Sequence, residues 1–342
     1  MKKHIKDFDI SSAQDSALSF YIKDKKDEKL KQKKSFYFQY NNSRRIKNII
    51  AIFLTFTISN CIAQLDSIKT LDYSLADSIA LNFHKKRYKS VSLITRDLTR
   101  GLTNEYDIYR VVFRWITDNI KYKEGKYGTD PDKILRQKKG VCEGYSHLLK
   151  RMCIEAGINC KVIVGSSKTS ARKDINQPLN ANHAWNAVKL NNHWYLTDIT
   201  WASGYYDKKF HKEFDETYFL TDPNFFKLNH YPDEKRWLLT DKIYRKSTFK
   251  NSPVFHSALS SNGIKMQSKA KGKVKNKLVM KFSSETEIES MKIWFENQKY
   301  YEILDFVKCG DRYEVNHKFD NRDYGEFYVF LNNELILSYL KK

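Results

Sequence analysis

The sequence predicts an α+β fold. Helices lead into a helix that begins at a cysteine, this helix packs on an antiparallel sheet, and a small β-sandwich follows. Apolar residues recur at helical spacing within residues 140–157. Two runs of alternating apolar and polar residues flank Asn191-Asn192, as in a β-hairpin. Short alternating runs then fill residues 277–339, which is typical of a sandwich of short strands.

Residues 140–157, GVCEGYSHLLKRMCIEAG, predict one buried helix that starts at Cys142. Its apolar face consists of Tyr145, Leu148, Leu149, Met152, Cys153 and Ala156. Gly157 follows, where a left-handed glycine commonly ends a helix. Free N–H groups and the positive end of the helix dipole favour a thiolate at a helix N-terminus. Cys142 is therefore a candidate nucleophile, and a small core residue is the alternative interpretation.

The segment before this helix is predicted to be helical. Apolar spacing indicates helices over residues 92–102 and 105–122. A third, short helix runs to about residue 137, with Asp130 as its N-cap and Pro131 in its first turn.

The hairpin around Asn191-Asn192 places a histidine and an aspartate on one face. With a two-residue loop, Leu190 pairs with His193 and Trp185 lies opposite Asp198. His183 and Asp198 are then diagonal neighbours about 7 Å apart, close enough for an imidazole–carboxylate hydrogen bond. Together with Cys142 they make the set that a cysteine hydrolase needs: a thiolate, a base and a carboxylate that orients the base.

Other polar residues near this hairpin are less informative. A strand is predicted over residues 160–164, and the polar stretch 166–182 is either a substrate-facing flap or disordered. Side chains that could support the site are those of Asn182, Asn186 and Thr200. The remaining histidines of this region, which we interpret as structural, are His147, His193 and His230. No metal site and no cofactor are expected, because neither C-x-x-C nor H-x-x-x-H spacing occurs.

Charge and the N-terminal segment suggest where the protein acts. The net charge of +21 falls to +14 without residues 1–47, a basic segment predicted to be disordered, and the excess is spread along the chain. Spread charge is typical of proteins in anionic surroundings, and nucleic-acid binding is not expected. Residues 48–63, with an uncharged apolar run of ten after Arg44, Arg45 and Lys47, predict a secretory signal. The alternative is a short membrane anchor over the same residues.

Export would bring the cysteines into an oxidising compartment. Cys142 must stay free if it is a nucleophile. Cys153 and Cys160 are expected to be buried apolar residues rather than a bridge, and Cys309 is expected to be structural.

Three motifs in order support a family resemblance: GVCEGY at 140–145, HAWN at 183–186 and WYLTDITW at 194–201. Together they resemble the transglutaminase-like, papain-related superfamily. Residues 218–226, YFLTDPNFF, with the later HYP at 230–232, are similar to its kyphoscoliosis-peptidase-like branch. The resemblance covers residues 81–239, about half of the chain.

The resemblance implies a papain-like core with Cys142 as nucleophile, His183 as general base and acid, and Asp198 orienting it. It implies a transglutaminase-like domain over residues 65–240, and the alternating runs after it indicate a C-terminal binding or positioning module over residues 245–342. The oxyanion donors suggested by the sequence are the Cys142 backbone N–H and the side chain of Gln137.

The expected function is that of an exported cysteine enzyme that cleaves or transfers at peptide or carboxamide bonds through an acyl-thioester. Its expected partners are a protein or peptide substrate and components of the cell envelope, with membrane contact only through an uncleaved N-terminal segment. A peptidase acting on cell-wall peptides is one alternative. The other is a catalytically silent adaptor that keeps the fold for protein binding.

Overall fold

The computed structural model describes residues 71–83, 88–207, 209–267, 270–320 and 322–342. Within it, Asp72–Lys342 form one compact unit. The predicted basic segment 1–47 and the signal segment 48–63 lie outside the described residues. Across the described ranges, no helix combines the length and the apolar character that crossing a bilayer requires.

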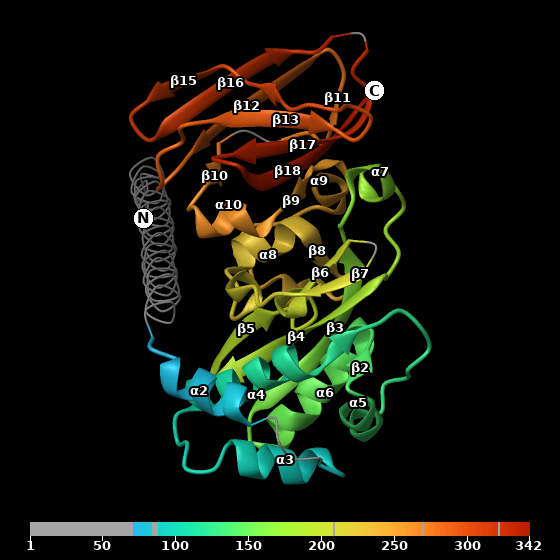
Figure 1. Ribbon diagram of the computed structural model, residues 1–342, viewed down its shortest axis with the longest axis vertical. Helices are drawn as coiled ribbons and strands as arrows, with labels where there is room; N and C mark the ends of the chain where they lie inside the picture. Colours follow the sequence, from blue (N-terminus) through green and yellow to red (C-terminus); the bar gives the residue numbers. More distant parts are fainter. Residues whose placement is uncertain (1–70, 84–87, 208, 268–269, 321) are drawn as a thin grey trace, which may run out of the picture. The chain divides into compact units, whose positions relative to one another are not determined.

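The first part of this unit is helical (Figure 1). Its helices are α2 (Ser74–Asn82), α3 (Val91–Leu98), α4 (Glu105–Asn119), α5 (Pro131–Gln137) and α6 (Cys142–Glu155). The predictions for α3 and α4 ran three or four residues too far. After α4, the chain becomes strand β1 (Lys121–Tyr122), which pairs in parallel with β2 (Lys139–Gly140). Helix α5 begins as predicted, with the Asp130 carboxylate accepting from the N–H of Lys133.

Helix α6 confirms the prediction from residues 140–157. It starts at Cys142, and five of the six predicted core side chains are fully buried: Tyr145, Leu148, Leu149, Met152 and Cys153. Gly157 follows with φ +79°, in the left-handed region that ends helices. The helix contacts strands β3 and β4, so one face of the sheet receives its apolar stripe.

The sheet beside α6 has the order β5-β4-β3-β8, and its neighbouring strands are antiparallel. The strands are β3 (Asn159–Ser167), β4 (His183–Leu190), β5 (His193–Thr197) and β8 (His230–Pro232). Asn191 and Asn192 have φ of 45° and 67°, the positive values of a type I′ turn. Leu190 pairs with His193, so the predicted two-residue loop and its register are confirmed.

Strand β3 is longer than predicted because it has a second partner. It continues beyond residue 164 and pairs with β8, where Gly165 lies opposite Pro232. A Cβ at Gly165 would lie 2.3 Å from the carbonyl oxygen of Tyr231, so a side chain does not fit at this position. The predicted loop 166–182 therefore begins as strand.

Two further predictions for this region were wrong. The alternating run after Asn192 extends to residue 201 in the sequence and predicts a strand of that length. Strand β5 ends at Thr197 instead, because the Asp198 side chain accepts from the backbone N–H groups that follow and turns the chain into η1 (Trp201–Ser203). The stretch 166–182 is not disordered, since it contains α7 (Ala171–Asp174), whose first turn is capped by the distant Glu326. The contact between Glu326 and α7 cannot be predicted from local sequence patterns.

Short elements lead from β5 to β8 and onward. They are the hairpin β6 (Gly204–Asp207) and β7 (Lys209–Lys212), then η2 (Glu216–Tyr218), α8 (Pro223–Asn229), η3 (Lys235–Leu238), α9 (Lys246–Asn251) and α10 (Ser257–Ser261).

The C-terminal part is all β, as predicted, and is built from two sheets (Figure 1). One contains β10 (Lys265–Met266), β12 (Lys277–Ser283), β16 (Arg312–Lys318) and β15 (Phe306–Cys309). The other contains β9 (Val254–Phe255), β11 (Lys273–Val274), β18 (Glu334–Lys341), β17 (Gly325–Leu331), β13 (Met291–Phe295) and β14 (Glu302–Ile303). Burial alternates along β12 and β13, so each of these strands buries one face.

Details of this part agree with the sequence with one exception. Asn332 and Asn333 have positive φ and connect β17 to β18, as expected for a hairpin. Cys309, expected to be structural, is an exposed thiol on β15. The division into domains at residues 65–240 and 245–342 stays a prediction.

Candidate active site

Cys142 occupies the first position of helix α6. The preceding Val141 is extended and offers no side-chain cap, so the first N–H groups of the helix have no intrahelical acceptor. The thiol is partly exposed, whereas the apolar residues that follow it in the helix are buried. Cys142 therefore lies where the helix dipole favours a thiolate and where a substrate can reach it.

Buried hydrogen bonds fix α6 against strand β4. The hydroxyl of Ser146, one turn beyond Cys142, donates to the carbonyl oxygen of Ala184 at 3.0 Å. The amide of Asn186 donates to the carbonyl oxygen of Ser146, also at 3.0 Å. Both polar side chains are fully buried, so these bonds form in surroundings where leaving them unmade would be costly. They hold the cysteine helix in register with the strand that begins at His183.

The hairpin brings the predicted histidine and aspartate together. His183 begins β4 and Asp198 follows the last residue of β5, one step beyond the pair Asn186–Thr197. Nε2 of His183 lies 2.6 Å from Oδ2 of Asp198, and both side chains are buried. The diagonal contact predicted from the register is therefore confirmed.

The Asp198 carboxylate is surrounded by hydrogen-bond donors. Its Oδ1 accepts from the backbone N–H groups of Thr200 and Trp201, both at 3.0 Å. Its Oδ2 lies 2.6 Å from Nε2 of His183 and 2.9 Å from Nε2 of His230. Burial by itself raises the pKa of Asp198, but the two histidines outweigh it and hold that pKa well below the usual range. Asp198 is therefore an ionised, fully buried carboxylate.

The three predicted residues shift one another's protonation. Burial lowers the pKa of His183, but the charge of Asp198 and its hydrogen bond raise it above the ordinary value, with a smaller contribution from Cys142. Burial raises the pKa of Cys142, yet hydrogen bonding to His183 and the charge of His183 bring it below the ordinary value. Since Nε2 of His183 faces Asp198, Nδ1 is the nitrogen left for the sulfur. A thiolate–imidazolium pair is the arrangement that these shifts favour.

His230 is the residue that sequence reasoning missed. We interpreted it as a structural histidine, and the structure places its ring against the same carboxylate oxygen that His183 contacts. It begins β8, two strands away from β4 in the sheet. Its only sequence signal is its place in the HYP segment of the family resemblance, which says nothing of its partner.

The other residues considered from the sequence have supporting positions. Asn182 binds the backbone of Ser167 through both ends of its side-chain amide, and this anchors the chain just before His183. Thr200 contributes its backbone N–H to Asp198, not its hydroxyl. Gln137, the candidate oxyanion donor, is an exposed residue at the end of α5.

His183, Asp198 and His230 also form a possible metal-binding set, since their ligand atoms lie within 4.8 Å of one another. Hydrogen bonding already accounts for their arrangement, because one ionised carboxylate oxygen accepts from both Nε2–H groups. A metal would need the lone pairs of these same nitrogens. The donor set therefore fits a hydrogen-bonded network better than a metal centre.

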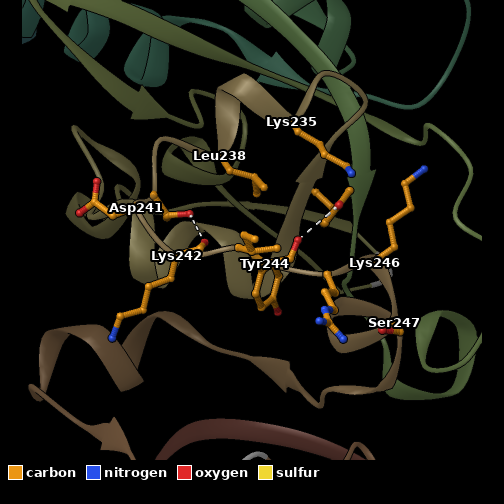
Figure 2. A pocket seen from close by; sticks show the side chains of 11 residues that line it. Lys235, Leu238, Asp241, Lys242, Tyr244, Lys246 and Ser247 are labelled. Carbon is orange, nitrogen blue, oxygen red and sulfur yellow. Dashed lines mark hydrogen bonds between the residues drawn. The ribbon is translucent and has the colours of Figure 1, made fainter. Parts of the chain in front are cut away.

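A cavity of 470 Å³ lies in the segment that follows His230, and it is separate from this set (Figure 2). Its lining begins at Tyr231 and carries the cationic residues Lys235, Lys242, Arg245 and Lys246 with the carboxylate of Asp241. Tyr231 and Tyr244 contact each other within it, through the hydroxyl of Tyr231 and the carbonyl oxygen of Tyr244. None of the residues Cys142, His183 and Asp198 lines this cavity.

Comparison with known proteins finds a family match in the part of the chain that holds this site. Residues 93–199, which include Cys142, His183 and Asp198, match the model of the transglutaminase-like superfamily. Kyphoscoliosis peptidase of Mus musculus is 32% identical over 206 residues, covering 57% of this chain and 31% of that protein. Kyphoscoliosis peptidase of Homo sapiens is 33% identical over 182 residues, covering 50% of this chain and 27% of that protein.

A solved structure described as a TGase has a TM-score of 0.26 and 16% identity, covering 48% of this chain and 43% of that chain. The chain spans less than a third of the length of the two peptidases. The similarity to a transglutaminase-like superfamily domain therefore concerns residues 93–199 of this chain.

Proposed function

We propose that this chain, with its transglutaminase-like domain, is a cysteine enzyme that acts on peptide or carboxamide bonds. In this proposal Cys142 is the nucleophile, His183 is the general base and acid, and Asp198 orients His183. The observation that carries the proposal is the chain of contacts from the thiol at the start of α6 through His183 to the buried Asp198 carboxylate, 2.6 Å from the imidazole. The name of the two similar peptidases supports the same class of reaction.

The first half of the reaction forms an acyl-enzyme. The Cys142 thiolate attacks the carbonyl carbon, and the carbonyl electron pair moves to oxygen. The first N–H groups of α6 point toward the oxyanion that develops. As the tetrahedral intermediate collapses, Nδ1–H of the His183 imidazolium gives its proton to the departing amine. A thioester on Cys142 and a free amine result.

In the second half of the reaction, His183 acts first as a base. Neutral His183 removes a proton from water, the hydroxide oxygen attacks the thioester, and the carboxylic acid leaves as the thiolate–imidazolium pair returns. The side-chain amine of a lysine in place of water would attack the thioester, lose a proton to His183 and give an isopeptide bond as the thiolate leaves. Hydrolysis is the proposed default, because the partly exposed Cys142 is open to water.

Asp198 contributes in two ways. Its Oδ2 fixes the Nε2–H tautomer of neutral His183, so Nδ1 is free to take the proton. Its negative charge stabilises the imidazolium that exists between turnovers. Because the carboxylate is itself held by two backbone N–H groups, it does not need to move during the reaction.

Export belongs to the same proposal. The charged and then apolar sequence of residues 44–63 supports it, and a substrate among proteins or peptides of the cell envelope would follow from it. The N-terminal residue of the mature protein, determined from the producing cells, tests this point. Cleavage near residue 63 supports export, and an intact chain that fractionates with the cytosol contradicts it.

Thiol reactivity tests the catalytic proposal with an internal control. The purified protein is treated with iodoacetamide at pH 6, and modified cysteines are mapped by mass spectrometry. Cys309 is more exposed than Cys142, so exposure alone predicts faster alkylation of Cys309. We expect the opposite order, because only Cys142 has an imidazole beside it. His183→Ala should abolish the preference, whereas His193→Ala, an exposed residue at the start of β5, should leave it unchanged.

The products then define the reaction. Fluorogenic peptide amides report hydrolysis, and incorporation of a dansylated primary amine reports transfer, with Cys142→Ser as the inactive control. Slow alkylation of Cys142, equal in wild type and His183→Ala, together with the absence of both products would contradict the proposal and favour a catalytically silent adaptor.

A further inference from the structure

Two imidazoles share one carboxylate oxygen in this structure. Oδ2 of Asp198 lies 2.6 Å from Nε2 of His183 and 2.9 Å from Nε2 of His230. The reaction proposed above uses only His183. His230 approaches from β8 and is 1% exposed, so it cannot meet a substrate, and its hydrogen bond to Asp198 links it to the reacting groups.

Aromatic rings hold the His230 side chain in one orientation. Phe226, one helical turn earlier in α8, stacks on it with ring centroids 3.9 Å apart. Trp201 lies 4.4 Å away and Trp185 meets it edge-on at 5.1 Å. Close packing on these sides prevents the ring from turning away, so the contact with Asp198 is a fixed feature of the site.

Proton positions in the cluster follow from the chemistry of the acceptor. An ionised carboxylate only accepts, so both Nε2 atoms carry hydrogen. The second nitrogen of His230 lies 3.3 Å from the carbonyl oxygen of Phe226. Burial lowers the pKa of His230, and its hydrogen bonds to Asp198 and to the Phe226 carbonyl oxygen oppose this only in part. The pKa of His183 is shifted the other way, so the positive charge of the pair is favoured on His183.

We propose that His230 is a positioning residue that acts through Asp198: by donating to the same oxygen, it limits how strongly Asp198 holds the proton of His183. The catalytic importance of this role rests on the proposed function. The effect of His230 on the protonation of His183 can be measured whether or not that function holds. A carboxylate oxygen that receives two donors is a weaker acceptor for each of them. The imidazolium of His183 can therefore surrender its proton to a leaving amine more readily than it could in a simple pair.

The titratable groups that face His230 are few among the described residues. Asp198 and His183 lie on the side of β4 and β5, and Tyr218 of η2 has its ring centroid 6.5 Å away. Burial raises the pKa of Tyr218 well above its ordinary value, so this phenol stays neutral throughout. The remaining close neighbours are the three aromatic rings above. The titration of His183 is therefore the direct readout of what His230 does.

The test compares two substitutions at one position. His230→Leu removes the N–H donor, and His230→Gln keeps an N–H at nearly the same reach. Asp198 should remain in place in both, because Thr200 and Trp201 still bind its other oxygen. The protonation midpoint of His183 is measured by NMR on protein with ¹³C-labelled histidine. His193→Leu serves as the control for loss of a histidine.

We expect the His183 midpoint in His230→Leu to rise by roughly half a unit to one unit, with His230→Gln returning close to wild type. A midpoint that stays in place, moves down, or shifts equally in the Leu and Gln variants overturns the proposal. Circular dichroism confirms that each variant is folded. If Cys142 of the wild type shows no selective alkylation, the enzymatic proposal fails, yet the NMR midpoint still decides the role of His230.

Discussion

Two buried charged side chains, Asp198 and Lys168, lie in the same part of the molecule and differ in their partners. Asp198 has no exposure to solvent, and two of its four donors are imidazoles that can carry the opposite charge. Lys168, just beyond β3, is 1% exposed, and its Nζ donates to neutral acceptors: the carbonyl oxygens of Ser252 and Pro253 and the hydroxyl of Ser252. The ring of Phe249 lies 4.8 Å from the same nitrogen.

The difference in partners decides the state of each group. The pKa of Asp198 is lowered despite its burial, because the charge of His183 and the hydrogen bonds from both histidines compensate for the lost hydration. Burial lowers the pKa of Lys168 to about 7, because carbonyl oxygens and an aromatic ring compensate less for the lost hydration of the ammonium group. The charge of Asp174 opposes this shift only weakly. The cluster around Asp198 keeps its charges and can transfer protons. The amine of Lys168 has a pKa near neutral pH, so its hydrogen bonds to the neighbouring acceptors depend on pH.

Asp198→Asn should have the largest effect. A neutral amide does not stabilise the imidazolium of His183 by its charge. Only one end of the asparagine side chain accepts hydrogen bonds, so it cannot accept from both the histidines and the backbone N–H groups. We expect peptide hydrolysis to fall by about 10²- to 10⁴-fold, since a neutral replacement of a triad carboxylate acts mainly through the histidine. Single-turnover rates measure this. The control is Asp174→Asn, which lies outside the cluster and should leave the rate unchanged.

An Asp198→Asn rate close to that of the wild type would contradict this expectation. It would mean that the charge of Asp198 contributes to stability and not to catalysis.

Lys168→Met should change the pH dependence of stability. Between pH 7 and about 10.4 the unfolded lysine holds a proton that the folded one has lost, so this residue makes unfolding less favourable as pH rises. The sign for His183 is opposite: its pKa is raised on folding, so its stabilisation is complete below about 6.5 and is lost as pH rises through the folded value.

The difference between wild type and Lys168→Met isolates the lysine. We expect the unfolding free energy of the wild type to gain about 1.4 kcal/mol per pH unit on the variant between pH 7.5 and 9. Urea titrations at four pH values measure it. A constant difference across this range would show that Lys168 keeps its proton and that neutral acceptors suffice after all.

Glu326→Gln should moderately lower the stability of the protein and loosen the segment before His183. The buried Glu326 carboxylate of β17 accepts from the hydroxyl of Ser170 and from the backbone N–H groups of Ala171 and Arg172. An amide keeps only one acceptor oxygen, so we expect a loss of about 1–3 kcal/mol. Denaturant unfolding measures it, and hydrogen exchange should locate faster opening in residues 168–176. Protection unchanged there would argue that this contact does not hold the segment.

Glu296→Gln should have the smallest effect. Its salt bridge to Arg172 anchors the same short helix at 2.7 Å, but both side chains are substantially exposed, at 43% and 60%. We expect a loss of at most about 1 kcal/mol, and less at high salt, because solvent screens exposed pairs. Parallel unfolding curves with Glu326→Gln at low and high salt compare the two. A loss as large as that of the buried acid would contradict the distinction drawn from burial.

The sequence was sufficient for the parts of the site that lie within one or two elements. The apolar period after Cys142 predicts α6, and Asn191-Asn192 predicts the register that joins His183 to Asp198. These succeeded because side-chain periodicity and turn chemistry are local. The alternative that residues 166–182 are disordered was wrong because Glu326, which caps α7, is more than 150 residues away.

Local sequence patterns were enough to predict the helix that begins at Cys142, the hairpin that pairs His183 with Asp198, and the all-β character of the C-terminal part. Long-range packing was needed to show that His230 shares the Asp198 oxygen, that Lys168 donates to neutral acceptors in the interior, and that Glu326 secures the segment before His183. The reason is that spacing along the chain fixes which face of an element a residue occupies. Which distant face it meets depends on strand pairing and packing, here of β8 on β3, which local periodicity does not encode.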